Sequence, residues 1–408
     1  MMKGLTHFPF KITMSYFHVT TSEQLNHLIE QMRPSAWVGF DTEFISEGRY
    51  QSQLCLVQVA YDQGLAIIDP TTVHDLNPFW SLLCDGRREV IVHAGRSELE
   101  FCYRAIHKLP EWFFDVQVAA GFVGLDYPIG FRDLVEKTLG IQVSKGETRT
   151  DWLKRPLSSR QIEYALNDVR HLFELTKILR KKLKEKDRFV WFHGESMQTT
   201  YRLKREMEIP KWRTTPKSST LPPRQQAIVR ELWFWRDRVA KKSNHISARI
   251  LRDDLIVEIA KLESSDLTRI EAIRGLNRPD LARQYGDMKK AISRALTLDR
   301  SELPELAEKQ SYPQYTAMVQ FLYTAFNMIC KKHGFSTQLV GTQLDVRELV
   351  AHLYHTLPEG IIPRLTRGWR SLLTGNLLED LINGKICMKL NREHPEEPIE
   401  FVRIVDSG

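Results

Sequence analysis

Apolar and polar positions up to about residue 185 predict strands that alternate with helices. Residues 16–19 form a short apolar run, and Thr21 with Gln24 then predicts a capped helix. A strand at 89–93 precedes an amphipathic helix at 97–106. β-Branched and aromatic residues between turn-like residues predict three consecutive strands of a meander: 37–44, 53–60 and 64–68. This order predicts an α/β domain built on a mixed sheet flanked by helices.

A long helix after residue 157 has the clearest signals in this domain. Ser158 occupies the N-cap position and Gln161 the third helical position, which together make a capping box. The apolar spacing continues without proline or glycine to about residue 185. Tyr164 and Asp168 are four residues apart, so their side chains share one face of this helix.

Beyond this domain the pattern changes to short helical segments. Residues 221–300 predict a small all-α bundle. Residues 309–393 look like a degenerate second copy, because 315–331 matches 225–240 in length and apolar spacing. We therefore predict five parts: an α/β domain at 14–205, a basic linker at 206–220, the two bundles, and a tail at 394–408.

Composition favours a soluble protein with an anionic partner. The chain has 408 residues, too many for one core, and no apolar run near the roughly 20 residues that span a bilayer. Five scattered cysteines without a CxxC pair are typical of reduced thiols in a cytosolic protein. Residues 1–14 do not resemble a signal peptide, and Met14 could be the true start. The net charge of +7 favours a polyanion, although the basic residues at 180–217 fit a solvated helix face equally well.

The stretch 38–44 carries the first candidate chemistry. Side chains alternate faces along a strand, so Asp41 and Glu43 point the same way. Two acids on one face repel each other, and a hard divalent cation that binds both would remove that cost. Taken alone, this pair is more typical of a solvated strand end.

Three later places change that interpretation: His93 to Glu98 at a strand-to-helix turn, Asp115 before an apolar helix, and the pair Tyr164 and Asp168. The set resembles the DEDDy 3′→5′ exonucleases, and within them the ribonuclease D family. The stretches 53–58, 145–157 and 163–169 extend the resemblance over most of 16–175. Residues 221–298 resemble the HRDC domain (helicase and RNase D C-terminal), with 251–254 and the helix at Gly286 as its marks.

The resemblance implies a ribonuclease-H-like fold and hydrolysis with two divalent metal ions, Mg²⁺ or Mn²⁺, about 3.5–4 Å apart. Asp41 would bridge the ions, and Glu43 with Asp168 would complete the site on the side of the nucleophile. Tyr164 would orient the attacking water, since a phenol is a poor base at neutral pH. Glu98 stands where the family has Asp. Glutamate is one methylene longer than aspartate. If the site can adjust, Glu98 could coordinate the metal directly or in a shifted position. If the site is rigid, the metal would be displaced and catalysis would be weak or lost.

Other polar residues near these motifs have structural interpretations as well. His93 fits a hydrogen-bonded structural residue, and Asp115 a structural or helix-capping acid. Lys145, Arg149 and Trp152 could bind the substrate backbone, but charge pairing of Arg149 inside the fold is equally plausible.

The predicted function is a metal-dependent exoribonuclease that trims RNA 3′ ends, with catalytic Asp41, Glu43, Glu98, Tyr164 and Asp168. The resemblance suggests tRNA precursors as partners, a monomer in the cytoplasm, and no membrane association. One alternative is a 3′→5′ DNA exonuclease, which the same residues would serve. The other is a nucleic-acid-binding protein whose catalysis is impaired by Glu98.

Overall fold

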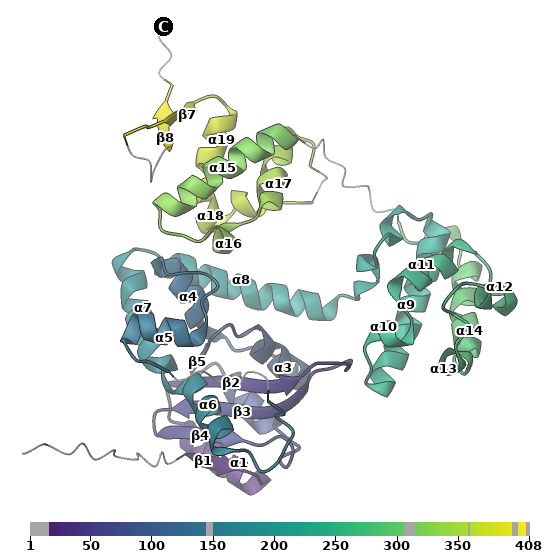
Figure 1. Cartoon of the computed structure of the whole chain (residues 1–408), viewed down its shortest axis with the longest axis horizontal. Coiled ribbons are helices and arrows are strands. Elements are labelled where there is room, and N and C mark those ends of the chain that lie inside the picture. Colours follow the sequence, from purple (N-terminus) through teal and green to yellow (C-terminus); the bar gives the residue numbers. More distant parts are fainter. Residues whose placement is uncertain (1–15, 144–149, 306–314, 358–359, 394–398, 405–408) are drawn as a thin grey trace, which may run out of the picture. The chain divides into compact units, whose positions relative to one another are not determined.

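The computed structural model describes residues 16–143, 150–305, 315–357, 360–393 and 399–404 (Figure 1). The chain divides into two compact units, which we describe separately. The first comprises residues 1–44, 54–119 and 129–185, and the second residues 45–53, 120–128 and 186–408.

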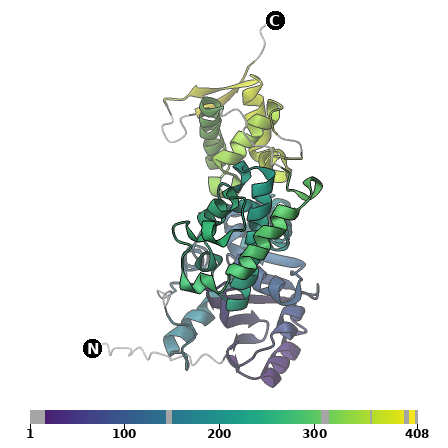
Figure 2. The same cartoon turned by 90° about the vertical axis from the view of Figure 1, so that its right-hand side faces the viewer.

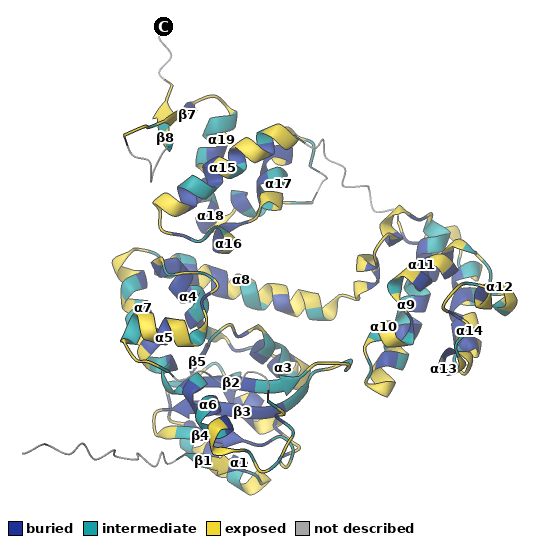
Figure 3. Ribbon diagram, in the orientation of Figure 1, coloured by how far each residue is buried: buried dark blue, intermediate teal, exposed yellow. Residues whose placement is uncertain are grey.

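A six-stranded sheet is the centre of the first unit. Its strands are β1 (Phe17–Val19), β2 (Trp37–Ile45), β3 (Gln53–Tyr61), β4 (Gly64–Ile68), β5 (Glu89–Val92) and β6 (Trp112–Asp115). They lie in the order β1-β4-β3-β2-β5-β6. The pairs β1–β4, β2–β5 and β5–β6 are parallel, while β3–β4 is antiparallel, which confirms the mixed sheet. Much of β2 and β3 is buried, as their dark blue colour shows (Figure 3).

Seven helices accompany this sheet in the described chain up to residue 185. They are α1 (Ser22–Met32), α2 (Asn77–Leu83), α3 (Arg96–Ile106), α4 (Val116–Val123), α5 (Phe131–Leu139), α6 (Ser159–Arg170) and α7 (Leu172–Glu185). The main core lies between the sheet and α1 to α3. There the ring of Phe40 meets the edges of Phe79 and Trp80, each at 6.0 Å between ring centroids.

Both predicted capping boxes are present. The Thr21 and Ser158 hydroxyls accept the backbone N–H of Gln24 and Gln161 at 3.2 Å, and both glutamines reach back to the cap. The single helix predicted from Ser158 to about residue 185 is wrong, because the chain leaves helical geometry at His171 and restarts as α7. Leu172 then packs on β2, where a Cβ on Gly39 would lie 3.0 Å from its Cδ1. Packing on the sheet outweighs the local preference for one helix.

The second unit begins with α8 (Phe189–Glu208), which is followed by two 3₁₀ turns, η1 (Lys211–Thr214) and η2 (Ser218–Thr220). The sequence predicts a linker here, but the side chains of Trp212 and Ser218 are buried. Both turns contact α9, so this stretch packs on the following bundle.

The first bundle contains α9 (Pro223–Ser243), α10 (Ser247–Ile250), α11 (Asp253–Lys261), α12 (Leu267–Glu271), α13 (Pro279–Ala282), α14 (Tyr285–Thr297) and the turn η3 (Arg300–Glu302). Figures 1 and 2 show its two longest helices, α9 and α14, side by side. The one helix predicted over 280–296 is divided into α13 and α14, and the Tyr285 hydroxyl donates to the Leu276 carbonyl at this junction.

The second bundle contains α15 (Thr316–Lys332), α16 (Thr337–Val340), α17 (Gln343–Leu353), η4 (Arg364–Thr366), α18 (Gly368–Arg370), a π-helical turn η5 (Ser371–Gly375) and α19 (Asn376–Ile382). It is not all-α. Strands β7 (Ile386–Leu390) and β8 (Ile399–Arg403) pair antiparallel, so part of the tail predicted at 394–408 is a strand. Pairing satisfies backbone groups that a loose tail would leave to water.

Candidate active site

Strand β2 places the first two acids. It pairs with β5 over Trp37–Gly39, and Asp41 with Glu43 follow this paired stretch on one face of the strand. The carboxyl end of a parallel strand is where the chain leaves the sheet, so side chains from neighbouring connections can approach it.

The turn from β5 to α3 places Glu98. Ala94 has a φ of 54°, and at Gly95 a Cβ would lie 2.2 Å from Val92 Cγ2, so a side chain there would collide. The carboxylate of Asp115 accepts the N–H groups of Ala94 and Gly95, each at 3.0 Å. It also accepts the N–H of Gln117 at the start of α4, at 2.9 Å. Asp115 is therefore a structural and helix-capping acid, as predicted.

Glu98 is buried in the first turn of α3, and one of its oxygens has a partner from β2. The Thr42 hydroxyl, also buried, donates to Glu98 Oε1 at 2.6 Å. Sequence reasoning missed Thr42, because the contact joins residues 56 apart and no local motif marks it. Backbone hydrogen bonds from Glu98 and Thr42 also reach this carboxylate, so its position is fixed by the chain.

Helix α6 contributes Tyr164 and Asp168, whose side chains hydrogen-bond to each other. The ring of Trp152 lies 6.0 Å from that of Tyr164 and is buried, so Trp152 supports the tyrosine from within the fold. Lys145 and Arg149 lie outside the described residues.

A buried ion pair secures the segment before α6. Arg155 donates to both carboxylate oxygens of Asp69, at 2.5 and 2.8 Å, and to the carbonyls of Cys55 and Trp152. Burial raises the pKa of Asp69, but the bonds from Arg155 and Thr71 lower it more, so the net shift is downward. The sequence singled out the stretch 145–157, but gave no sign of Asp69 as its anchor.

Three of the four acids that the sequence singles out lie close to one another in the structure. One carboxylate oxygen from each of Asp41, Glu43 and Asp168 lies within 4.8 Å of the other two. Among the described residues, Glu98 is not a member of this closest group. Its charge nevertheless raises the pKa of both Asp41 and Glu43, so it lies beside them.

The acids of this cluster repel one another and are poorly solvated. Burial, followed by the charge of Glu98 and then of the other acids, raises the pKa of Asp41 well above its usual value. Burial and the charges of Asp168 and Glu98 raise the pKa of Glu43 to about 8. Burial also raises the pKa of Asp168 to about 7, against the hydrogen bond from Tyr164. A cation held by these oxygens would relieve the repulsion, so the donor set fits a hard divalent ion.

Two further groups near the cluster stay neutral at pH 7. Burial, and then the charges of Asp168 and Glu43, raise the pKa of Tyr164 above its usual value, so it remains a phenol that can donate. Burial lowers the pKa of His93, and its Nε2 lies 2.9 Å from the Ile129 carbonyl oxygen. His93 is thus a hydrogen-bonded structural residue, as predicted.

Acids clustered on a mixed sheet that is followed by a small helical bundle are typical of a 3′→5′ exonuclease with an HRDC domain, and two family models match these parts. The family model for the 3′-5′ exonuclease matches residues 16–184, and that for the HRDC domain matches residues 225–292. The chain belongs to the ribonuclease D family, whose members are 3′→5′ exoribonucleases. The family is metal-dependent.

Relatives cover almost the whole chain. Ribonuclease D of Cronobacter turicensis is 30% identical over 89% of this chain and 99% of its own length. That of Pseudomonas paraeruginosa is 32% identical over 85% of this chain and 92% of its own. The crystal structure of Escherichia coli RNase D, 27% identical, superposes with a TM-score of 0.79 and covers 91% of this chain and 99% of that one. In the described part of the chain, no helix has the length and apolar character that a membrane crossing requires.

Proposed function

We propose that Asp41, Glu43 and Asp168 bind divalent Mg²⁺ or Mn²⁺, and that Glu98 completes the second of two ion sites. The main support for this proposal is that three carboxylate oxygens, one from each residue, lie within 4.8 Å of one another. Their raised pKa values support it, because like charges gathered in a poorly solvated place need a counter-charge.

The protein's own residues would orient the reactants. When bound, two ions supply a water nucleophile at neutral pH and neutralise charge on the attacking and leaving oxygens. Tyr164 stays protonated and its O–H donates to Asp168, so its oxygen would accept a hydrogen bond from the attacking water and position it rather than remove its proton. Thr42 holds Glu98 Oε1, which lets the longer acid replace the Asp of the family.

We propose RNA with a free 3′ end as the substrate and tRNA precursors as its natural form, processed by a cytoplasmic monomer. The similar Escherichia coli enzyme is described as an exoribonuclease involved in structured RNA processing. Residues 14–205 would form the catalytic domain and 221–300 the HRDC domain. Residues 309–393 would be a second, HRDC-type module, whose strand β7 pairs with β8 beyond it.

The test is incubation with 3′-labelled RNA and DNA of one sequence, in Mg²⁺, in Mn²⁺ and in EDTA. We expect shortening of RNA from the 3′ end that EDTA abolishes and that Asp168→Asn reduces by about 10³-fold. Asp62→Asn, a matched change at an exposed acid, should retain activity. Faster shortening of DNA would favour the DNA exonuclease. RNA binding without metal-dependent shortening would favour the alternative of a nucleic-acid-binding protein with impaired catalysis.

A further inference from the structure

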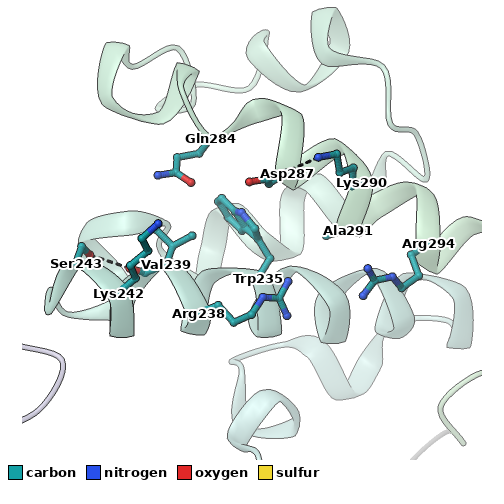
Figure 4. Close-up of a pocket in the computed structure, with 10 residues that line it drawn as sticks. All are labelled: Trp235, Arg238, Val239, Lys242, Ser243, Gln284, Asp287, Lys290, Ala291 and Arg294. Carbon is teal, nitrogen blue, oxygen red and sulfur yellow. Dashed lines mark hydrogen bonds and ion pairs between the residues drawn. The ribbon is translucent and has the colours of Figure 1, made fainter.

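Grooves lined by cations occur in both units. One lies in the first bundle, around the indole of Trp235 (Figure 4), and belongs to the HRDC domain described above. Another lies in the first unit, between α7 and the amino ends of β2 and β5, and has a volume of about 750 Å³. We call it the α7 groove. Its residues that matter here are Trp37, Glu89, Phe173, Thr176, Lys177 and Lys181.

The α7 groove lies at the opposite edge of the sheet from the clustered acids. Trp37 and Glu89 are the first residues of β2 and β5, and they pair with each other. Asp41 is four residues further along β2, which is about 13 Å at the usual rise of a strand. A ligand in the groove would therefore lie outside the proposed metal site.

The charge of the α7 groove suits an anion. Among the described residues, no carboxylate lies within ion-pair distance of Lys177, which is exposed. Glu89 already accepts a hydrogen bond from Arg180 at 2.6 Å. Lys181 lies 3.8 Å from Glu185, but both side chains are largely exposed, so water or an anion can replace this contact. Positive charge thus remains for a ligand.

Two buried polar atoms in the lining are an independent sign of a ligand. The hydroxyl of Thr176, which is 2% exposed, and the indole Nε1 of Trp37 have no hydrogen-bond partner among the described residues. A buried polar group without a partner costs free energy, so it usually has one in the functional state. The indole N–H can only donate, and the hydroxyl can donate as well. An acceptor oxygen is the partner that fits both.

The same lining contains an aromatic surface. The rings of Trp37 and Phe173 stack at 4.3 Å between centroids, 7° from parallel, and Lys177 Nζ lies 4.3 Å from the Phe173 centroid. Trp37 is only half-buried, so part of it is accessible to a planar group. The volume of the groove is in the range that holds a small molecule. An aromatic ring, cations and unpaired donors together suit a nucleotide.

We propose that the α7 groove binds a nucleoside monophosphate at a second site, away from the acids around Asp41. Lys177 and Lys181 would bind the phosphate, and oxygens of the ligand would accept from Thr176 and Trp37. Hydrolysis of RNA from its 3′ end releases molecules of this class, so the enzyme would bind its own product there. The choice of ligand rests on the proposed function, whereas the groove itself does not.

The test measures binding of AMP to the full chain by titration calorimetry in EDTA, where no metal ion can hold a phosphate at the acids. We expect one site per chain and about tenfold weaker binding in Lys177→Gln/Lys181→Gln. The control, Lys108→Gln/Lys186→Gln, removes two exposed lysines outside the groove lining and should bind AMP as the wild type does. Equal losses in both variants would overturn the proposal in favour of a diffuse field.

Thr176→Val tests the buried hydroxyl. It keeps the shape of the side chain, so AMP binding should weaken several-fold while the thermal midpoint without ligand stays unchanged or rises. A lower midpoint with unchanged affinity would show a purely structural threonine and overturn its assignment to the ligand.

Other ligands separate the alternatives. Adenosine and inorganic phosphate should each bind more weakly than AMP, and inorganic phosphate binding as tightly would overturn the choice of a nucleotide. Weaker binding of a hairpin RNA by Lys177→Gln/Lys181→Gln, with unchanged binding of AMP, would overturn it in favour of RNA. Because these measurements need no hydrolysis, an inactive protein that binds AMP would contradict the proposed function alone.

Discussion

The half-buried acids around Asp41 and the buried Glu195 have opposite electrostatics. In the first unit, burial and mutual repulsion raise the pKa values of the acids around Asp41. In the second unit, Glu195 of α8 accepts hydrogen bonds from Arg370 at 2.5 Å and Trp369 at 3.2 Å. Burial raises the pKa of Glu195, but the bond and charge of Arg370 lower it more, and the net shift is downward.

The difference lies in where the counter-charge comes from. Glu195 has its cations in the chain, from Arg370 and Arg364, so its burial is already compensated and its role is to hold the second bundle to α8. The acids around Asp41 have only Thr42 and Tyr164 as described side-chain donors. Protonation or a bound cation can compensate their charge, which agrees with the proposed metal site.

Neutralising Asp41 should have the largest effect and should change activity and stability in opposite directions. Asp41→Asn should reduce RNA hydrolysis by about 10³-fold or more, because the residue that we propose to bridge both ions is lost. The same change should raise the thermal midpoint of the metal-free protein, since it removes one of several repelling charges. Hydrolysis of labelled RNA and thermal unfolding in EDTA measure the two effects. A metal-free Asp41→Asn protein less stable than the wild type would contradict the electrostatic account.

Removing Glu195 should destabilise the protein, in contrast to the stabilisation expected for metal-free Asp41→Asn. Glu195→Ala leaves Arg370 buried without its carboxylate, which should cost about 3–5 kcal/mol in the free energy of unfolding. Denaturant unfolding measures this loss. Gln198→Ala, at an exposed position of the same helix, is the control and should change little. Hydrolysis of a five-nucleotide RNA by the folded variant should stay near the wild-type rate.

The stability of the protein should depend on pH through the acids around Asp41. A carboxyl whose pKa is raised by folding stays protonated in the native state after the unfolded chain has ionised. Its contribution therefore becomes unfavourable as pH rises from about 4.5 to about 8, the raised pKa of Glu43. The thermal midpoint in EDTA, compared between wild type and Glu43→Gln, should show a growing deficit of the wild type over this window. Mg²⁺ should remove most of that deficit, and a constant difference across pH would contradict this.

The sequence was sufficient for features that depend on local pattern. The capping boxes at Thr21 and Ser158 and the strands follow from local periodicity and motif. The convergence of Asp41, Glu43 and Asp168 follows from the resemblance to the ribonuclease D family. That these acids bind metal stays a prediction. Features decided by tertiary packing were missed, such as the break at His171, where contact with β2 redirects the helix.

Long-range pairs were missed for the same reason. Arg155 and Asp69 are 86 residues apart, and neither position shows by its type that the other is its partner. Strand β8 was missed because its run is short and largely exposed, and because its pairing partner β7 is not marked by any local signal. Local propensity carries no information on such partners.

The smallest effect concerns Glu98 and its hydrogen bond from Thr42. Thr42→Val keeps the shape of the side chain but removes the hydroxyl that donates to Glu98. It should reduce hydrolysis about 10–100-fold, because loss of a residue that orients a metal ligand has an effect of this size. Thr42→Ser should keep most of the activity, which a purely steric role would not explain. Glu98→Asp should also reduce the rate, because the shorter side chain cannot reach Thr42 and the metal position together.

The double variant Thr42→Val/Glu98→Asp decides whether these two residues act as one unit. If Thr42 works only through Glu98, the double variant should be about as slow as the slower single variant, so the losses should not add. Steady-state rates on a five-nucleotide RNA across Mg²⁺ concentrations measure this, since a misplaced carboxylate should also raise the Mg²⁺ requirement. Glu98→Asp faster than wild type would show that the glutamate is a handicap rather than an adapted ligand.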